Sequence, residues 1–341
     1  MIGMYLHHQG SGHRIRGTAI ATEMTHQVTG LGSGTAPRGW PGPWVELPRD
    51  HDVYEGAQYV DPEASGLLHW APLHHRGLLE RQAIITAWVQ SNRPDLMVVD
   101  TSTEVALLAR LCGIPVVVSA MPGDRSDRAH RAAYDLATAL LAPWPASTTR
   151  WPWPEAWLAK TFHAGGISRF AGRTASTASR AGLEHRVLVL WGRGGTDVSD
   201  EDIRDAHRAT PGWTWVHRGG AHPPALDVWR ELCEADVVVT HAGQNSVADV
   251  AAARRPAVVI AQQRPHFEQH ATIDALERLG ICPALVAWPA AEEWNAVLER
   301  ALSCGGQGWK AWDGPGAAGA GRWLDEQADT FTHLRRTGAR P

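Results

Sequence analysis

Short hydrophobic runs alternate along the chain with amphipathic stretches, and this alternation predicts an α/β protein with parallel sheets. The run at 236–240 (DVVVT) contains three consecutive valines, which is typical of a strand buried on both faces. Other short apolar runs occur at 95–100 (DLMVVD) and 186–190 (RVLVL), and helical patterns alternate with such runs, for example over 76–90 and 101–113. Because strand and helix patterns take turns, we expect each strand to be joined to the next through a helix.

The pattern twice begins with a strand that runs into a Gly-rich loop. Ile2–His8 leads to such a loop at 9–13, and the run at 186–190 leads to a second one at 191–196. A chain of 341 residues suggests about two domains, and we predict that both are Rossmann-like. The predicted boundaries are 1–165 for the first domain, 166–185 for a hinge, 186–321 for the second domain, and 322–341 for a terminal helix that packs back on the first domain.

A dense set of polar residues follows the strand at 236–240. These residues fall where the chain turns into a helix, which we expect to begin near Ser246–Val247. A helix start offers unpaired backbone N–H groups and the positive end of the helix dipole, so it suits phosphate. The turn residues are His241, Gly243, Asn245 and Ser246.

Two carboxylates and an amide accompany this turn. Asp249 lies one turn into the predicted helix, and its carboxylate can accept hydrogen bonds from two ribose hydroxyls. Glu268 and Gln269 follow the next predicted strand, 257–261, in a loop at the same carboxyl edge of the sheet. An ordinary loop has no need for these residue types at these offsets, so the stretch points to a ligand site.

The stretch 236–271 resembles the donor-binding motif of GT-B glycosyltransferases, in particular the plant-type HCGWNS…E…DQ signature. It is also similar to the family that adds N-acetylglucosamine to the lipid-linked peptidoglycan precursor. In those families the His–Gly–Ser part holds the donor diphosphate, the helix carboxylate holds the ribose, and the acid–Gln pair contacts the sugar. The matching residues here are His241, Gly243, Asn245, Ser246, Asp249, Glu268 and Gln269. Glu268 replaces the commoner Asp, so the identity of the transferred sugar stays open.

The resemblance implies two Rossmann-like domains that face each other across a cleft, with the acceptor bound by the first domain and a nucleotide diphosphate-sugar by the second. UDP is the expected nucleotide. The acceptor is left open between a small molecule, a lipid-linked molecule and a polymer. Because the peptidoglycan-type enzymes dock on membranes, peripheral membrane association stays open as well.

The first Gly-rich loop, which ends in Gly12 and His13, fails as a GxGxxG motif because Ile15 occupies the third glycine position. It resembles instead the first loop of the peptidoglycan enzymes, which is Gly-rich, ends in His and faces the cleft. The resemblance assigns Gly12 to the diphosphate and His13 to the acceptor hydroxyl, as base or as positioning group. A neutral imidazole is well matched to removing that proton near pH 7.

Asp100 ends the predicted strand at 95–100 and is the second candidate catalytic residue. Its carboxylate could pair with His13 or cap the helix that follows, and the position directly before a helix favours the cap. Both interpretations stay open from the sequence.

The second Gly-rich loop resembles the GGS turn that approaches the donor diphosphate. This assigns Gly194 and Gly195 to the diphosphate, where Arg193 could add a cation. His217 and Arg218 lie at the end of a predicted strand over 213–217, and by the same resemblance they would lie close to the nucleotide base.

We predict no metal and no other cofactor. The DxD in Asp200-Glu201-Asp202 directly precedes an amphipathic helix, where acidic residues interact favourably with the helix dipole. The adjacent His74 and His75 point to different faces of most elements, which makes them poor joint ligands. A helix start can stabilise a leaving diphosphate in place of a metal ion.

The composition further narrows the functional class and the expected location of the protein. A net charge of −4 argues against a general nucleic-acid binder. The four cysteines are widely spaced in apolar settings, so we predict buried free thiols and a cytoplasmic location. The first residues lack a signal-peptide pattern, and no run reaches the ~20 apolar residues of a membrane span.

The resemblance therefore implies an inverting, metal-independent glycosyltransferase that moves a sugar from a nucleotide diphosphate donor to an acceptor hydroxyl. Three alternatives stay open: a nucleotide-sugar hydrolase of the same fold, an epimerase, and a non-catalytic sugar-nucleotide-binding homologue. No second acid–base pair is obvious for an epimerase. The presence of Asp249, Glu268 and Gln269 favours retained donor binding.

Overall fold

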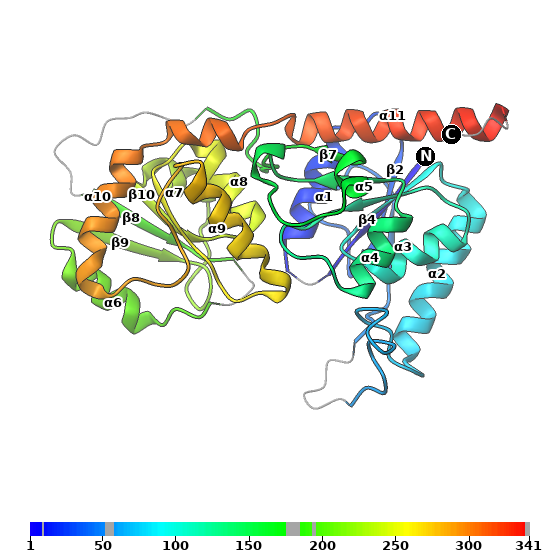
Figure 1. Ribbon diagram of the computed structural model, residues 1–341, viewed down its shortest axis with the longest axis horizontal. Helices are drawn as coiled ribbons and strands as arrows, with labels where there is room; N and C mark the ends of the chain where they lie inside the picture. The colour runs from blue at the N-terminus through cyan, green and yellow to red at the C-terminus, as the bar shows by residue number, and fades with distance from the viewer. Residues whose placement is uncertain (9, 52–57, 175–184, 193–195, 338–341) are drawn as a thin grey trace. The chain divides into compact units, whose positions relative to one another are not determined.

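The computed structural model describes residues 1–8, 10–51, 58–174, 185–192 and 196–337, which form two compact units (Figure 1). Unit 1 comprises 1–143, 152–164 and 317–341, and unit 2 comprises 144–151 and 165–316. The predicted turn residues Gly194 and Gly195, together with Arg193, lie outside the described residues, as do 175–184 of the predicted hinge. Among the described residues, no helix is both long and apolar enough to cross a membrane.

Unit 1 is built on a parallel sheet with the strand order β3-β2-β1-β4-β5-β6-β7. The chain adds β2 and β3 on one side of β1 and the remaining strands on the other, so the order reverses between β1 and β4. Ligands of open α/β sheets bind at the carboxyl ends of the strands beside such a switch. The strands are β1 Ile2–Leu6, β2 Val28–Ser33, β3 Trp44–Leu47, β4 Leu96–Asp100, β5 Val116–Ser119, β6 Ala139–Ala142 and β7 Thr161–His163.

Helices connect these strands, except that β2 and β3 are joined without a helix, contrary to the expectation that each strand leads to the next through one. The helices form where the intervening segments carry amphipathic patterns with recognisable caps. His75 caps α2, Ser102 caps α3 and Asp127 caps α4, each through a side chain that accepts a backbone N–H. The helices of unit 1 are α1 Gly12–Thr22, α2 Arg76–Asn92, α3 Thr103–Leu111, α4 Arg128–Leu136, α5 Glu155–Ala159 and α11 Gly316–Thr337, which enters the unit at residue 317.

Helix α11, red in Figure 1, is anchored to the rest of unit 1 by specific contacts. The Asp325 carboxylate accepts hydrogen bonds from the Thr25 backbone N–H and hydroxyl, both at 2.7 Å. The Trp323 ring stacks on Phe162 with the ring centroids 4.7 Å apart. These contacts explain why the end of the chain belongs to the first unit.

Unit 2 repeats the architecture with a parallel sheet in the order β12-β11-β10-β8-β9, so its switch lies between β8 and β10. The strands are β8 His185–Leu190, β9 Trp213–Arg218, β10 Val237–His241, β11 Ala257–Ile260 and β12 Ala284–Leu285. The helices are α6 Asp200–Ala209, α7 Val228–Glu234, α8 Gln244–Ala253, α9 Glu268–Arg278 and α10 Trp294–Cys304, with 3-10 turns η1 Ala146–Thr148, η2 Pro265–Phe267, η3 Ala291–Glu293 and η4 Gln307–Trp312.

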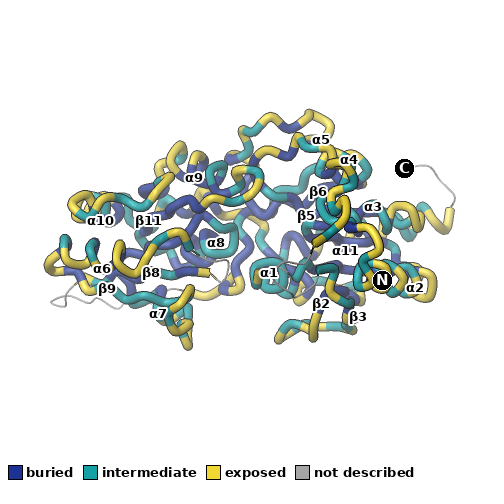
Figure 2. Tube along the Cα trace, turned by 90° about the horizontal axis from the view of Figure 1, so that it is seen from below, coloured by how far each residue is buried: buried dark blue, intermediate teal, exposed yellow. Residues whose placement is uncertain are grey.

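Each unit has its own hydrophobic core centred on its sheet, because helices cover the apolar strands (Figure 2). In unit 1, β1 and β4 are buried at every residue, and in unit 2 so is β10. Val187, Val239 and Trp294 belong to one buried cluster of unit 2. Burial on both faces agrees with the β-branched runs of the sequence.

Two predictions about local structure are wrong. The sequence pattern over 126–141 predicts one helix, but the structure has α4 followed by the strand β6, because Ala137 takes an extended conformation that ends the helix. The Gly/Pro-rich segment 34–43 forms a turn, and β3 follows it and pairs with β2. Cys112 is exposed rather than buried, whereas Cys282 is buried as predicted.

Candidate active site

The switch point of unit 1 brings together His13 and Asp100. His13 is the second residue of α1, and Asp100 is the last residue of β4. His13 Nδ1 lies 3.1 Å from Asp100 Oδ1. Arg16, one turn further along α1, donates from Nη2 to both carboxylate oxygens, at 2.8 and 3.0 Å. The result is a carboxylate held between an imidazole and a guanidinium.

The Asp100 carboxylate is ionised although it is only 3% exposed. Burial raises its pKa, but the charge of Arg16, the influence of His13 and the hydrogen bonds from both residues hold the pKa at about 2. An ionised carboxylate at Nδ1 favours the tautomer in which Nδ1 carries the proton. His13 Nε2 is then the nitrogen with a free lone pair, as a general base requires.

The interpretation of Asp100 as a helix cap is wrong. Ser102 is the N-cap of α3, and its hydroxyl accepts a hydrogen bond from the Val105 N–H at 3.2 Å. Thr101, with a φ of 58°, turns the chain between the strand and this cap. Asp100 is therefore left to interact with α1.

Two neighbours of His13 were not anticipated from the sequence. Arg16 lies three residues after His13, a spacing that puts both side chains on one face of α1, and this spacing could have indicated it. His7 packs edge-on against His13 with the ring centroids 5.8 Å apart. Burial, with smaller contributions from His13 and His8, lowers the pKa of His7 to about 3, so its imidazole is neutral.

The switch point of unit 2 carries the predicted donor residues around the start of α8. The helix begins at Gln244, two residues earlier than predicted, with Gly243 as its N-cap and no side chain capping it. Asn245 and Ser246 therefore lie within the first turn. The first backbone N–H groups of a helix have no partner within the helix, so this start can bind an anion.

His241 ends β10 and is packed against a tryptophan. Its ring stacks on Trp191 with the centroids 3.9 Å apart and the planes 2° from parallel. Burial, helped by the charge of Arg264, lowers the His241 pKa to about 3, so the imidazole is neutral. Its Nε2 is buried and has no hydrogen-bond partner among the residues that the structure describes. Such a nitrogen is costly for the fold, and a bound ligand could satisfy it.

Asp249 is 5% exposed and is engaged within unit 2. Ser168 Oγ donates to Oδ1 at 2.7 Å, and Arg169 Nε donates to Oδ2 at 3.0 Å. Burial raises the pKa of this carboxyl group, while Arg169 and the hydrogen bonds oppose the rise. Each carboxylate oxygen can accept more than one hydrogen bond, so a ribose would share Asp249 with these two residues or displace them.

Glu268 and Gln269 are the first two residues of helix α9, so the prediction that they lie in a loop is wrong, and a tight turn precedes them. His266 and Phe267 both have positive φ angles, 59° and 54°, which are costly for residues with a side chain. Gln269 is 5% exposed, and its Oε1 accepts a hydrogen bond from the Gln262 N–H at 2.8 Å. The strained turn thus fixes the Gln269 amide and begins a helix whose dipole favours the Glu268 carboxylate.

The remaining predicted residues lie at the ends of helices and strands. Gly12 is the first residue of α1. His217 and Arg218 end β9, but the Arg218 guanidinium donates to Glu231 at 2.9 Å and is committed to that ion pair. In the DxD, Asp202 forms a capping box with Ser199, so it serves the start of α6 as expected.

Comparison with protein families matches residues 229–282 to the glycosyltransferase family 28 C-terminal domain. The match contains β10, α8 and β11 and therefore every predicted donor residue from His241 to Gln269. Comparison with curated protein sequences finds no match.

Solved structures align with nearly the whole chain. The glycosyltransferase SnogD from Streptomyces nogalater is 18% identical, with a TM-score of 0.60 over 96% of this chain and 99% of that one. MurG from Acinetobacter baumannii is 14% identical, with a TM-score of 0.61 over 96% and 99%. The chain has the GT-B glycosyltransferase fold. The spinosyn rhamnosyltransferase SpnG, solved with thymidine diphosphate, is 14% identical, with a TM-score of 0.62 over 99% of both chains.

The predicted GT-B fold is thereby confirmed, and the predicted class of enzyme, a glycosyltransferase, is confirmed at the level of fold and domain family. The roles assigned to individual residues stay predictions.

Proposed function

We propose that the chain is an inverting, metal-independent glycosyltransferase that uses a nucleotide diphosphate-sugar, with UDP as the expected nucleotide, and needs no cofactor. The observation that carries the proposal is the His13–Asp100 pair at the switch point of unit 1, with the nitrogen and oxygen 3.1 Å apart. The start of α8 and the matched family 28 domain support a donor site in unit 2. The four free cysteines fit a reducing, cytoplasmic setting.

In the proposed reaction the acceptor hydroxyl oxygen attacks the anomeric carbon of the sugar as the carbon–oxygen bond to the diphosphate breaks. His13 Nε2 takes the hydroxyl proton, and Asp100 stabilises the imidazolium that forms. The diphosphate leaves with the bonding electrons. The N–H groups at the start of α8 and the Ser246 hydroxyl would stabilise its charge without a metal ion.

Donor binding is tested by thermal shift with UDP, GDP, dTDP, CMP and NAD, each with and without EDTA. A ligand that binds only the folded protein raises the melting temperature. We expect one nucleoside diphosphate to raise it equally with and without EDTA, and dTDP is in the panel because SpnG was solved with it. NAD alone raising the melting temperature would contradict the proposal.

Asp249→Asn is the matched test of the ribose contact. The amide retains the shape of the side chain but loses the charge, and we expect nucleotide affinity to fall about tenfold, the loss of roughly one hydrogen bond to a charged group. Asp274→Asn, an exposed position on α9, serves as the control and should bind like the wild type. Equal affinity in both variants would remove Asp249 from the donor site.

A further inference from the structure

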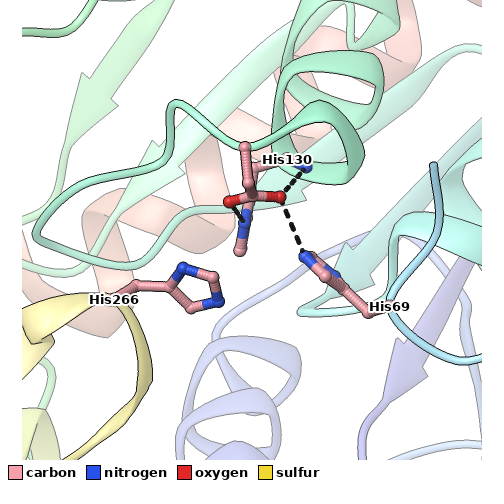
Figure 3. A group of neighbouring side chains, drawn as sticks. His69, His130 and His266 are labelled. Carbon is pink, nitrogen blue, oxygen red and sulfur yellow. Dashed lines mark hydrogen bonds and ion pairs between the residues drawn. The ribbon is translucent and has the colours of Figure 1, made fainter. Parts of the chain in front are cut away.

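A second cluster of histidines and a carboxylate lies in unit 1, apart from the His13–Asp100 pair. It consists of His69, Asp127 and His130, and Figure 3 shows the two imidazoles with the dashed interactions to the shared carboxylate. His69 Nε2 lies 3.2 Å from Asp127 Oδ1, and His130 Nδ1 lies 2.6 Å from Oδ2. The rings of His69 and His130 are 4.3 Å apart.

Backbone contacts hold each member in place. Asp127 is the N-cap of α4 and accepts the His130 N–H at 3.0 Å, and His130 lies one turn into the same helix. The backbone N–H of His69 donates to Glu104 of α3 at 2.8 Å. Because α3 and α4 follow β4 and β5, the cluster lies at the carboxyl edge of the unit 1 sheet, where open α/β sheets bind ligands.

The three side chains are close enough to share one metal ion. One ligand atom from each residue can be chosen so that all lie within 4.8 Å of one another. Zinc bonds imidazole nitrogen and carboxylate oxygen at roughly 2.0–2.2 Å, so ligand atoms around a tetrahedral ion are separated by roughly 3.3–3.6 Å. The N···O distances of 3.2 and 2.6 Å are shorter than this, because the nitrogens are hydrogen-bonded to the carboxylate. Binding an ion would replace these hydrogen bonds and move the atoms apart by up to about 1 Å.

We propose that His69, Asp127 and His130 bind a divalent transition-metal ion of the zinc class. Two imidazoles with one carboxylate are a donor set that suits such ions. Three protein ligands also leave a coordination position for water or for an oxygen of a bound molecule. This site goes beyond the proposed function, in which the leaving diphosphate is stabilised by α8 in unit 2.

The charges around the cluster are compatible with this assignment. The Arg125 guanidinium is turned to backbone oxygens, with Nη2 donating to the Pro122 carbonyl at 2.7 Å. Asp127 keeps a pKa below its ordinary value, because hydrogen bonds from His130 outweigh the effect of burial.

Two other groups in the described residues have comparable spacing but less suitable surroundings. In His8–Asp50–His51, the Arg81 guanidinium lies 3.4 Å from the carboxylate and already balances its charge. In Asp200–His217–His222, the Asp200 side chain is 53% exposed. Both groups provide controls.

The test is zinc binding to the full chain, measured by isothermal titration after removal of metal with a chelator, and the Co²⁺ absorption spectrum as a second readout. We expect one equivalent of tight binding and a Co²⁺ spectrum of low coordination number. His69→Ala and Asp127→Asn should each weaken binding by at least about tenfold, since loss of an outer-shell partner alone can cost that much. Asn still caps a helix, so Asp127→Asn should fold normally.

His51→Ala and His222→Ala are the matched controls and should bind zinc like the wild type. Melting temperatures of the metal-free variants verify that each is folded. The proposal is overturned if the wild type binds no zinc, or if binding survives in His69→Ala and Asp127→Asn, or if it is lost only in the control variants. Because the readout is metal binding, the result does not depend on the proposed glycosyl transfer.

Discussion

The candidate sites at the two switch points differ in the groups that form them, which are backbone N–H groups in unit 2 and side chains in unit 1. In unit 2 the proposed anion site at the start of α8 is mostly backbone, and it consists of consecutive residues from Gly243 to Ser246. In unit 1 the pair at the switch is made of side chains, with His13 and Arg16 from α1 and Asp100 from the end of β4. A backbone site should tolerate loss of a side chain, whereas a buried network of charges should not.

The largest effect is expected from Arg16→Met. The substitution leaves the Asp100 carboxylate buried without its cation, and removing one partner of a buried ion pair costs about 3–5 kcal/mol of unfolding free energy. Arg110→Met, at an exposed position on α3, is the control. Chemical denaturation of both variants measures the difference, and a cost below about 1 kcal/mol for Arg16→Met would mean that the pair is not tightly coupled.

The same pair predicts how stability depends on pH. The folded-state pKa of Asp100 is about 2, below the ordinary 3.8, so the pair stabilises the fold fully above about pH 4 and loses this contribution as the pH falls toward 2. In Asp100→Asn this part of the acid dependence should be absent. Melting temperatures of the wild type and of Asp100→Asn between pH 7 and pH 2 test the prediction. The same dependence on pH in both proteins would contradict it.

A smaller effect is expected from His241→Phe in unit 2. Phenylalanine can keep the stacking on Trp191 and removes a buried nitrogen for which the described residues offer no partner, so stability should be unchanged or rise. If Nε2 contacts the donor, nucleotide affinity should fall about tenfold, which is about 1.4 kcal/mol. Unchanged affinity would make His241 a core residue only.

The smallest effect is expected from Ser246→Ala. The backbone N–H groups of α8 remain, so only one hydroxyl contact is lost and nucleotide binding should weaken by no more than about 1 kcal/mol. Ser303→Ala, exposed on α10, is the control. A loss of a hundredfold in titration calorimetry would show that the site depends on the side chain rather than on the backbone.

The same contrast explains what could be predicted from the sequence. The predicted donor stretch is contiguous, so local spacing could predict the turn, a helix that begins within two residues of the observed start, and Asp249 on that helix. The partners of Asp249, Ser168 and Arg169, are about eighty residues away, and no local pattern indicates them.

The pairing of Asp100 with α1 is set by the adjacency of β1 and β4, so the sequence left it open beside the helix cap. The cluster of His69, Asp127 and His130 could not be foreseen for a related reason. His69 and Asp127 are 58 residues apart along the chain and meet only through the fold.

The proposed role of His13 as the base of a sugar transfer can be tested directly. We would measure release of nucleoside diphosphate from a panel of UDP- and dTDP-sugars by the wild type and by His13→Ala, with water as the slow acceptor and with candidate acceptors added. We expect the wild type to release nucleoside diphosphate and the rate to fall about 10²–10⁴-fold in His13→Ala, while both proteins show the same thermal shift with nucleotide. Equal release by both proteins would contradict it.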